Sequence, residues 1–235
     1  MTPFLVIVSV VLAIGLLALW QRQIALRREA YIRSFALPRG LFDRLRARHP
    51  ELTLKDCQLV SRGLRQFFLA YLKSGRRFVS MPSQVADDLW HEFILYTKNY
   101  EAFCGKAFGR FLHHTPAVVL ASERQSNAGL RRCWWYACQD ENINPRGATR
   151  LPLLFALDSK LNIANGFHYV ADCESVRRQG TDGRGSVVHC GGDFSSSAYD
   201  GGTDGLGDAG AGDSGGDSGG DGGGGCGGGC GGGGD

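Results

Sequence analysis

The sequence predicts a mainly α-helical protein with three parts: a single N-terminal transmembrane helix, a cytoplasmic helical domain and a disordered glycine-rich C-terminal tail. Three observations predict this architecture. Residues 3–20 carry no charged side chain, residues 55–73 repeat apolar side chains at helical spacing, and 23 of the last 45 residues are glycine. The expected parts are an anchor at 1–20, a basic juxtamembrane helix at 21–34, a helical body at 35–190 and the tail at 191–235.

The apolar stretch is long enough to span a bilayer as a helix. Its eighteen residues rise about 27 Å, close to the roughly 30 Å hydrocarbon core, and Trp20 suits the interface. The alternative is a cleavable signal peptide, which needs a basic region before the apolar core. No basic side chain precedes the stretch, whereas Arg22, Arg27, Arg28 and Arg33 follow it. The positive-inside rule therefore predicts a single-pass protein of the cell membrane, with its N-terminus outside and its body cytoplasmic.

Charge and cysteine usage fit a cytoplasmic body beside a membrane. The formal net charge of +3 hides an asymmetry, because the tail carries eight Asp and no Lys or Arg. The other 15 acidic residues face 26 basic ones, which leaves +11 on the rest of the chain. Attraction to an anionic membrane surface would explain this excess of positive charge. No RRM, KH or zinc-finger signature supports nucleic-acid binding. In a reducing cytoplasm the eight cysteines are free thiols or metal ligands rather than disulfides.

Helical spacing and capping signals locate the first helices of the body. Apolar side chains predict an amphipathic helix over residues 55–73. Ser83 suits the N-cap of a helix over residues 84–98. A third helix is expected over residues 99–108 and should end at Gly109.

The second half of the body is also predicted to be largely helical. Residues 117–140 favour a helix, and residues 151–158 are either a helix that Pro152 starts or a buried strand. We prefer the helix. Residues 166–170 resemble a short extended segment, but no alternating pattern is long enough for a full sheet.

The tail cannot bury enough apolar surface to offset the entropy of ordering, so we expect it to be disordered. As a flexible coil it spans about 35–40 Å, which lets it contact the chain's own basic body. Two thiols close to its end, Cys226 and Cys230, could bind a soft metal, although an inert tail is the simpler expectation.

The candidate site lies in an aromatic-rich region that holds three of the six histidines. Asp87 and His91 are four residues apart and share a helix face. An antiparallel return of the following segments would bring Cys104 and either His113 or His114 toward them, and such an Asp/His/Cys/His set would suit zinc or iron. The alternative is an aromatic core in which Asp87 and His91 form a satisfied polar pair and Cys104 packs as a small hydrophobe.

Catalytic signatures are scarce in this chain. The sequence has no G-x-S-x-G, Walker A, G-x-G-x-x-G or HExxH motif. A metal- or thiol-dependent hydrolase centred on His91, Cys104 and His114 remains as an alternative function, because a neighbouring imidazolium activates a thiol. We expect a binding protein rather than an enzyme.

The same region resembles a known family. Its residues read Asp87-x-x-Trp90-His91, Tyr100, Cys104, Gly109-Arg110 and His114. This pattern is similar to that of the glycine-rich domain-containing protein-like family, and the chain would be a membrane-anchored bacterial relative. The resemblance implies that His114 rather than His113 faces inward. Phe93 stands where many members have a second histidine, so a His-x-His pair is not implied. The resemblance implies no defined activity.

These observations predict a single-pass membrane protein whose cytoplasmic helical body is a binding or interaction module that a metal could stabilise. The membrane and an unidentified protein are the expected partners. Neither a substrate nor a specific metal follows from the residues.

Overall fold

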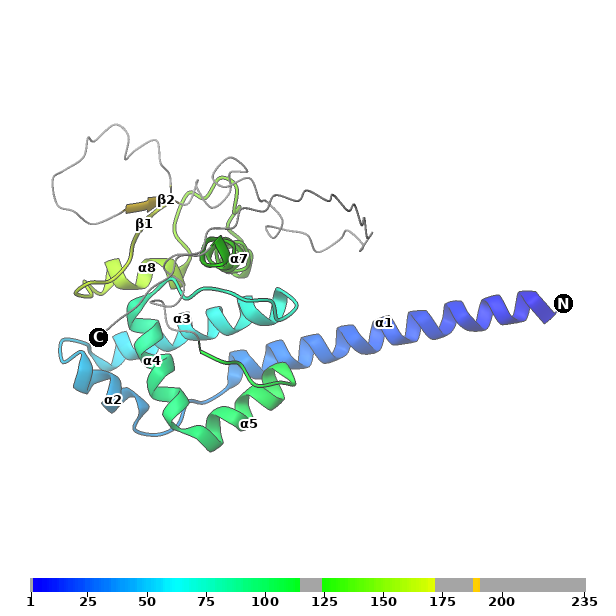
Figure 1. The fold of residues 1–235 in the computed structure, drawn as a ribbon, viewed down its shortest axis with the longest axis horizontal. Coiled ribbons are helices and arrows are strands. Elements are labelled where there is room, and N and C mark those ends of the chain that lie inside the picture. Colours follow the sequence, from blue (N-terminus) through cyan, green and yellow to red (C-terminus); the bar gives the residue numbers. More distant parts are fainter. Residues whose placement is uncertain (1, 115–123, 172–187, 191–235) are drawn as a thin grey trace, which may run out of the picture.

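The computed structural model describes residues 2–114, 124–171 and 188–190, and Figure 1 shows their arrangement. The described part is mainly helical, as the sequence predicts, with seven helices and one pair of short strands. The elements are α1 (Thr2–Ser34), α2 (Leu41–Arg48), α3 (Leu54–Lys73), α4 (Gln84–Leu95), α5 (Thr97–Phe108), α7 (Arg124–Asp140), α8 (Leu153–Lys160), β1 (His168–Val170) and β2 (Val188–Cys190). The tail at 191–235, expected to be disordered, lies outside the described residues.

Helix α1 is one continuous helix that runs through the expected anchor and the expected juxtamembrane stretch at 21–34. Its N-terminal part projects away from the body (Figure 1) and is not buried. Mean hydropathy reaches 2.6 in its most apolar window, so the helix is long and apolar enough to cross a membrane. A signal sequence near an N-terminus shares these two properties.

The C-terminal turns of α1 belong to the body. The ring of Phe35, just beyond the helix, lies 4.7 Å from that of Phe103 in α5. Arg33 forms an ion pair with Asp140 of α7, and Lys73 of α3 lies 3.6 Å from the same carboxylate. Apolar packing and ion pairs therefore fix the projecting helix to three body helices.

Helix α3 runs through the centre of the body and contacts α1, α2, α4, α7 and α8. It confirms the helix predicted over 55–73 and begins one residue earlier. Thr53 and Asp56 form a capping box at its start, which satisfies main-chain N–H groups that the helix leaves free. Gly63 permits the close approach of α8, because a Cβ at this position would lie 2.5 Å from Leu157 Cδ1.

An aromatic core joins α3, α4 and α5. The rings of Phe67 and Trp90 have centroids 5.0 Å apart, and Phe68 and Phe103 pack at the same separation. Such tilted and edge-on pairs suit the aromatic quadrupole. The aromatic core that the sequence allows as an alternative to a metal site is therefore present, and the polar cluster described below lies against it.

Helices α4 and α5 follow the predicted pattern with two differences, since α4 ends early and α5 begins at Thr97 rather than at residue 99. Ser83 caps α4, and its Oγ accepts a hydrogen bond from the Ala86 N–H at 3.3 Å. Helix α4 ends at Leu95 rather than at residue 98, because the chain turns at Tyr96, where ψ is 59°. Gly109 ends α5 as predicted, with a left-handed φ of 73° that glycine adopts without strain.

The second half of the body packs on α3. The prediction of helix over 117–140 is confirmed for α7, whereas residues 117–123 lie outside the described part. The segment 151–158 is helical, not extended, with Pro152 at the N-cap of α8. The extended piece near residue 168 is β1, which pairs in parallel with β2.

Candidate functional site

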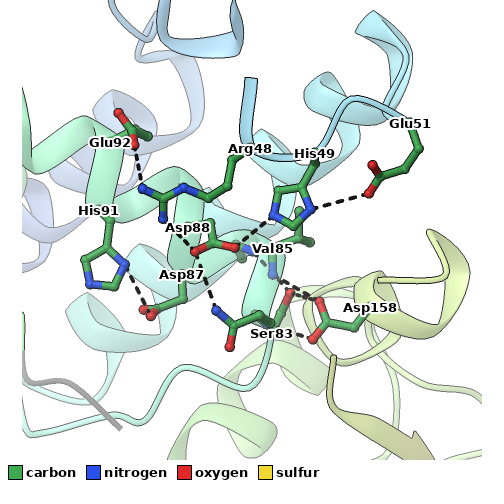
Figure 2. Close-up of polar contacts among 12 residues, drawn as sticks. Arg48, His49, Glu51, Ser83, Val85, Asp87, Asp88, His91, Glu92 and Asp158 are labelled. Carbon is green, nitrogen blue, oxygen red and sulfur yellow. Dashed lines mark hydrogen bonds and ion pairs between the residues drawn. The ribbon is translucent and has the colours of Figure 1, made fainter. Parts of the chain in front are cut away.

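Helix α4 carries two neighbouring polar faces, and Figure 2 shows both. Asp87 and His91 are one helical turn apart, and so are Asp88 and Glu92. Asp87 points toward His91, whereas Asp88 points toward side chains at the C-terminal end of α2 (Figure 2). The two adjacent aspartates therefore contact different sets of side chains.

The first face forms a cluster of one carboxylate and two imidazoles. Asp87 Oδ1 lies 2.9 Å from His114 Nε2, and Asp87 Oδ2 lies 3.5 Å from His91 Nδ1. The two imidazole rings have centroids 4.1 Å apart. One ligand atom from each residue lies within 4.8 Å of the others. Three of the four side chains that the sequence nominates thus converge.

Aromatic residues hold His114 in place although it follows α5 by several residues. Tyr100 donates a hydrogen bond from its hydroxyl to the Leu112 carbonyl at 2.6 Å and accepts one from Trp90 Nε1 at 3.1 Å. Burial raises the pKa of Tyr100, so the hydroxyl keeps its proton and remains a donor. The rings of Trp90 and His114 then pack in a T-shaped arrangement, with centroids 4.6 Å apart.

The donor atoms of the cluster lie close enough together to bind one divalent metal ion. With Zn–N and Zn–O bonds of about 2.0–2.1 Å, neighbouring ligand atoms of a tetrahedral site lie about 3.3 Å apart. The two Asp87–histidine distances, 2.9 Å from Oδ1 and 3.5 Å from Oδ2, involve different carboxylate oxygens, so ligation through one oxygen would require a small shift of side chains. Two histidines and one carboxylate also suit ferrous iron. The His91 side chain is 41% exposed, which leaves room for water as a further ligand.

Cys104 lies apart from this cluster. Its side chain is fully buried, and its hydrogen-bond partners are the Leu112 main chain and the Tyr100 side chain. Burial raises the pKa of Cys104, which favours the thiol over the thiolate that binds metals or attacks substrates. His113 is exposed, and its ring packs against Phe111 at 4.9 Å. His114 is therefore the member of the histidine pair that enters the cluster.

The second face of α4 is an ion-pair network that the sequence did not indicate. Asp88 and Glu92 are each 7% exposed. Arg48 of α2 reaches both carboxylates, at 3.0 and 2.9 Å, and His49 Nε2 lies 2.9 Å from Asp88 (Figure 2). Glu51 lies 3.4 Å from the other nitrogen of His49. Because these contacts hold Asp88, this carboxylate does not join Asp87 in the first cluster.

A buried carboxylate of α8 fixes the start of α4. Asp158 is 1% exposed and accepts hydrogen bonds from Ser83 Oγ, the Gln84 N–H and the Val85 N–H, at 2.7, 2.7 and 3.2 Å (Figure 2). A negative charge at a helix N-terminus also interacts favourably with the helix dipole. The second half of the body therefore positions the helix that carries Asp87.

Fold and site together define a helical domain that follows an apolar N-terminal helix and presents a cluster of two histidines and one carboxylate. The chain belongs to the UCP032817-like family, whose model matches residues 27–194. The match begins within α1 and covers the body, including the whole cluster. The likeness to the glycine-rich domain-containing protein-like family remains a resemblance of motif. No curated protein and no solved structure matches the chain.

Proposed function

We propose that this protein is a single-pass membrane protein whose cytoplasmic helical body is a binding module, stabilised by a divalent metal ion at Asp87, His91 and His114. The observation that carries the metal site is the convergence of these three side chains from α4 and from the segment after α5. Zinc and ferrous iron suit the donor set. The arginines that follow the apolar part of α1 support a cytoplasmic body.

In this proposal the metal joins two segments that are otherwise held mainly by packing. A ligand that binds only the folded state stabilises it by about 2.7 kcal/mol at a free concentration one hundred times its Kd. Metal binding would therefore fix the segment around His114 against α4 and shape the surface offered to a protein partner. The His91 side chain, which is 41% exposed, would border that surface.

The test is elemental analysis of the reduced full-length chain in detergent, beside His91→Ala, His114→Ala and His113→Ala. The last variant is a matched control, because His113 is an exposed histidine that adjoins the cluster without entering it. We expect about one equivalent of zinc or iron, lost in the first two variants and kept in the control. A metal-free chain that zinc does not stabilise against heat would refute the site.

A metal-dependent hydrolase is the second candidate. Its supporting observation is that three protein ligands beside an exposed edge resemble catalytic zinc sites, which keep one position for water. Hydrolysis of activated esters or phosphoesters by the zinc-loaded chain, abolished in His91→Ala but not in His113→Ala, would favour it. A thiol-dependent form has no geometric support, because Cys104 is buried outside the cluster.

The proposal extends to the acidic tail. Its eight Asp without a basic residue, against +11 on the rest of the chain, support a contact between tail and body that screens the body from an anionic surface. Deleting 191–235 should then strengthen the interaction of the body with anionic lipid at low salt. An unchanged interaction would dismiss this role of the tail.

A further inference from the structure

Basic side chains from four segments gather where α1 leaves the body. In Figure 1 the C-terminal ends of α3 and α5 lie beside α1, on the side from which its apolar part projects. We call this set the basic collar. It consists of Arg28 of α1, Arg76 and Arg77 after α3, Lys106 and Arg110 at the end of α5, and Arg132 of α7.

Close contacts join α1, the end of α3 and the end of α5 within the collar. Arg28 lies against Gly109, where an added Cβ would be 2.6 Å from its Nη2 atom. Arg76 Nη1 donates to the Phe108 carbonyl at 3.0 Å. Arg110 Nε donates to the Tyr71 hydroxyl at 3.0 Å, and its Nη2 donates to the main-chain carbonyl of Arg76.

Among the residues that the structure describes, no acidic side chain pairs with the cations of the collar. Its hydrogen bonds go to main-chain carbonyls and to the Tyr71 hydroxyl, and the described residues contain no ion pair between the collar and a carboxylate. The sequence explains this, because Asp and Glu are absent from residues 1–28, 74–86 and 102–114. Arginines elsewhere in the body do pair with acids, as Arg48 does with Asp88.

Two exposed phenylalanines adjoin these cations. Phe78 is 37% exposed, and its carbonyl accepts a hydrogen bond from Arg132. Phe111 is 43% exposed and follows Arg110 in the sequence, and its ring packs against Tyr100 and His113. Basic side chains interleaved with exposed aromatic rings are typical of surfaces that bind the head-group region of a bilayer, where rings enter the interface and cations meet lipid phosphates.

The distance along α1 brings the collar within reach of lipid head groups. Arg28 follows Trp20 by eight residues, which correspond to about 12 Å of helix. Each head-group layer is about 5–8 Å thick, and the Debye length at physiological salt is about 8 Å. If Trp20 marks the edge of the hydrocarbon core, the collar lies in the electrostatic field of the lipid surface.

We propose that the basic collar docks the body onto anionic phospholipid head groups of the membrane that α1 crosses. The inference rests on the membrane crossing proposed above but not on the metal site. It assigns a second membrane contact besides α1, made by side chains that folding collects from distant parts of the sequence. The body would then lie against the bilayer in one orientation.

The test uses the full chain in lipid nanodiscs made of phosphatidylcholine alone or with about one third phosphatidylglycerol. Amide hydrogen exchange is followed in residues 74–82 and 106–112. Each basic residue near an anionic surface strengthens docking about fivefold. We therefore expect slower exchange of both segments in the anionic discs at low salt, and loss of this protection at 0.5 M salt, where the Debye length is only about 4 Å.

Two double variants test which basic side chains contact the lipid head groups. Arg77→Gln with Lys106→Gln removes two exposed collar charges that make no hydrogen bond among the described residues, so the fold should persist. Lys55→Gln with Lys98→Gln removes equal charge from the opposite ends of the same two helices. The collar pair should lose the lipid-dependent protection, and the control pair should keep it.

Other outcomes overturn the inference. Equal rates of amide exchange in both lipid compositions would exclude head-group docking. Equal loss of protection in both double variants would show that net charge, rather than the collar, causes the effect. Protection that is independent of lipid and disappears when 191–235 is deleted would assign the collar to the tail instead. A chain that alkaline carbonate extracts from membranes would refute the crossing of α1 itself, which separates that failure from a failure of the collar.

Discussion

Replacing Asp158 with Asn should destabilise the body severely although it changes only one atom of the side chain. One carboxylate oxygen accepts from Ser83 Oγ and the Val85 N–H, and the other accepts from the Gln84 and Phe167 N–H groups. An amide NH2 would face two of these donors. Two hydrogen bonds to a buried charge are then lost at about 1.5–3 kcal/mol each, so with some relaxation we expect a loss of about 3–5 kcal/mol.

The measurement is reversible urea unfolding of the full chain in detergent micelles, followed by far-UV circular dichroism. The matched control is Asp56→Asn, because Asp56 also caps a helix but does so at the exposed surface, where water replaces the lost contacts. The control should lose much less stability. If Asp158→Asn costs no more than the control, the view that this buried carboxylate fixes the start of α4 is incorrect.

Three further predictions concern other buried groups. Burial would raise the pKa of Glu141, but hydrogen bonds, first that from the Leu153 N–H at 2.6 Å, lower it below its ordinary value of 4.5. The charged carboxylate therefore stabilises the fold above pH 4.5, and this stabilisation is lost as pH falls through the lowered pKa. Glu141→Gln should lower the free energy of unfolding by about 1–2 kcal/mol at pH 7 and by less at acidic pH, as unfolding titrations can measure. Gly166→Ala should cost about 1–3 kcal/mol in thermal melts, since the new Cβ would lie 2.6 Å from Asp158 Cβ; Gly105→Ala, with nothing within 4 Å, should be neutral or stabilising. Burial raises the pKa of four thiols, so iodoacetamide at pH 8 should label them only after denaturation, as mass spectrometry can show. These thiols are Cys57, Cys104, Cys133 and Cys138.

Most helices were predictable because their signals are local. The helix at 54–73 shows an apolar face over five turns, and Ser83 and Gly109 mark boundaries through hydrogen bonding and backbone conformation that each residue type favours. Helix α2 was missed because eight residues give little periodicity and Gly40 offers no side-chain cap. The break at Tyr96 has no Gly or Pro to signal it.

Some residues of the candidate site were predictable from local spacing, whereas the position of others depends on packing. Asp87 and His91 follow from the four-residue spacing on a helix, and His114 follows from the return of the chain after Gly109. Cys104 was nominated from its residue type and the expected return of the chain, but packing turns its helix face into the core.

The contacts that fix α4 from outside the helix had no local signal. Arg48 lies 40 residues before Asp88, and Asp158 lies 75 residues after Ser83. No sequence pattern pairs residues at such separations, and only the packing of α2 and α8 on α4 brings them together.

If α1 crosses a membrane as proposed, its continuity sets the rotational orientation of the body about the membrane normal. The helix runs unbroken from the apolar segment to Ser34, and Arg33 and Ile32 are fixed to the body by an ion pair and by full burial. No joint exists at which the two parts could turn independently. One residue inserted near Gln23 would rotate the body by about 100° and move it by about 1.5 Å, whereas a seven-residue insertion, close to two full turns, would nearly restore the phase. With α1 in a bilayer, the sequence between Trp20 and Arg28 would act as a spacer whose length selects which side of the body faces a given neighbour.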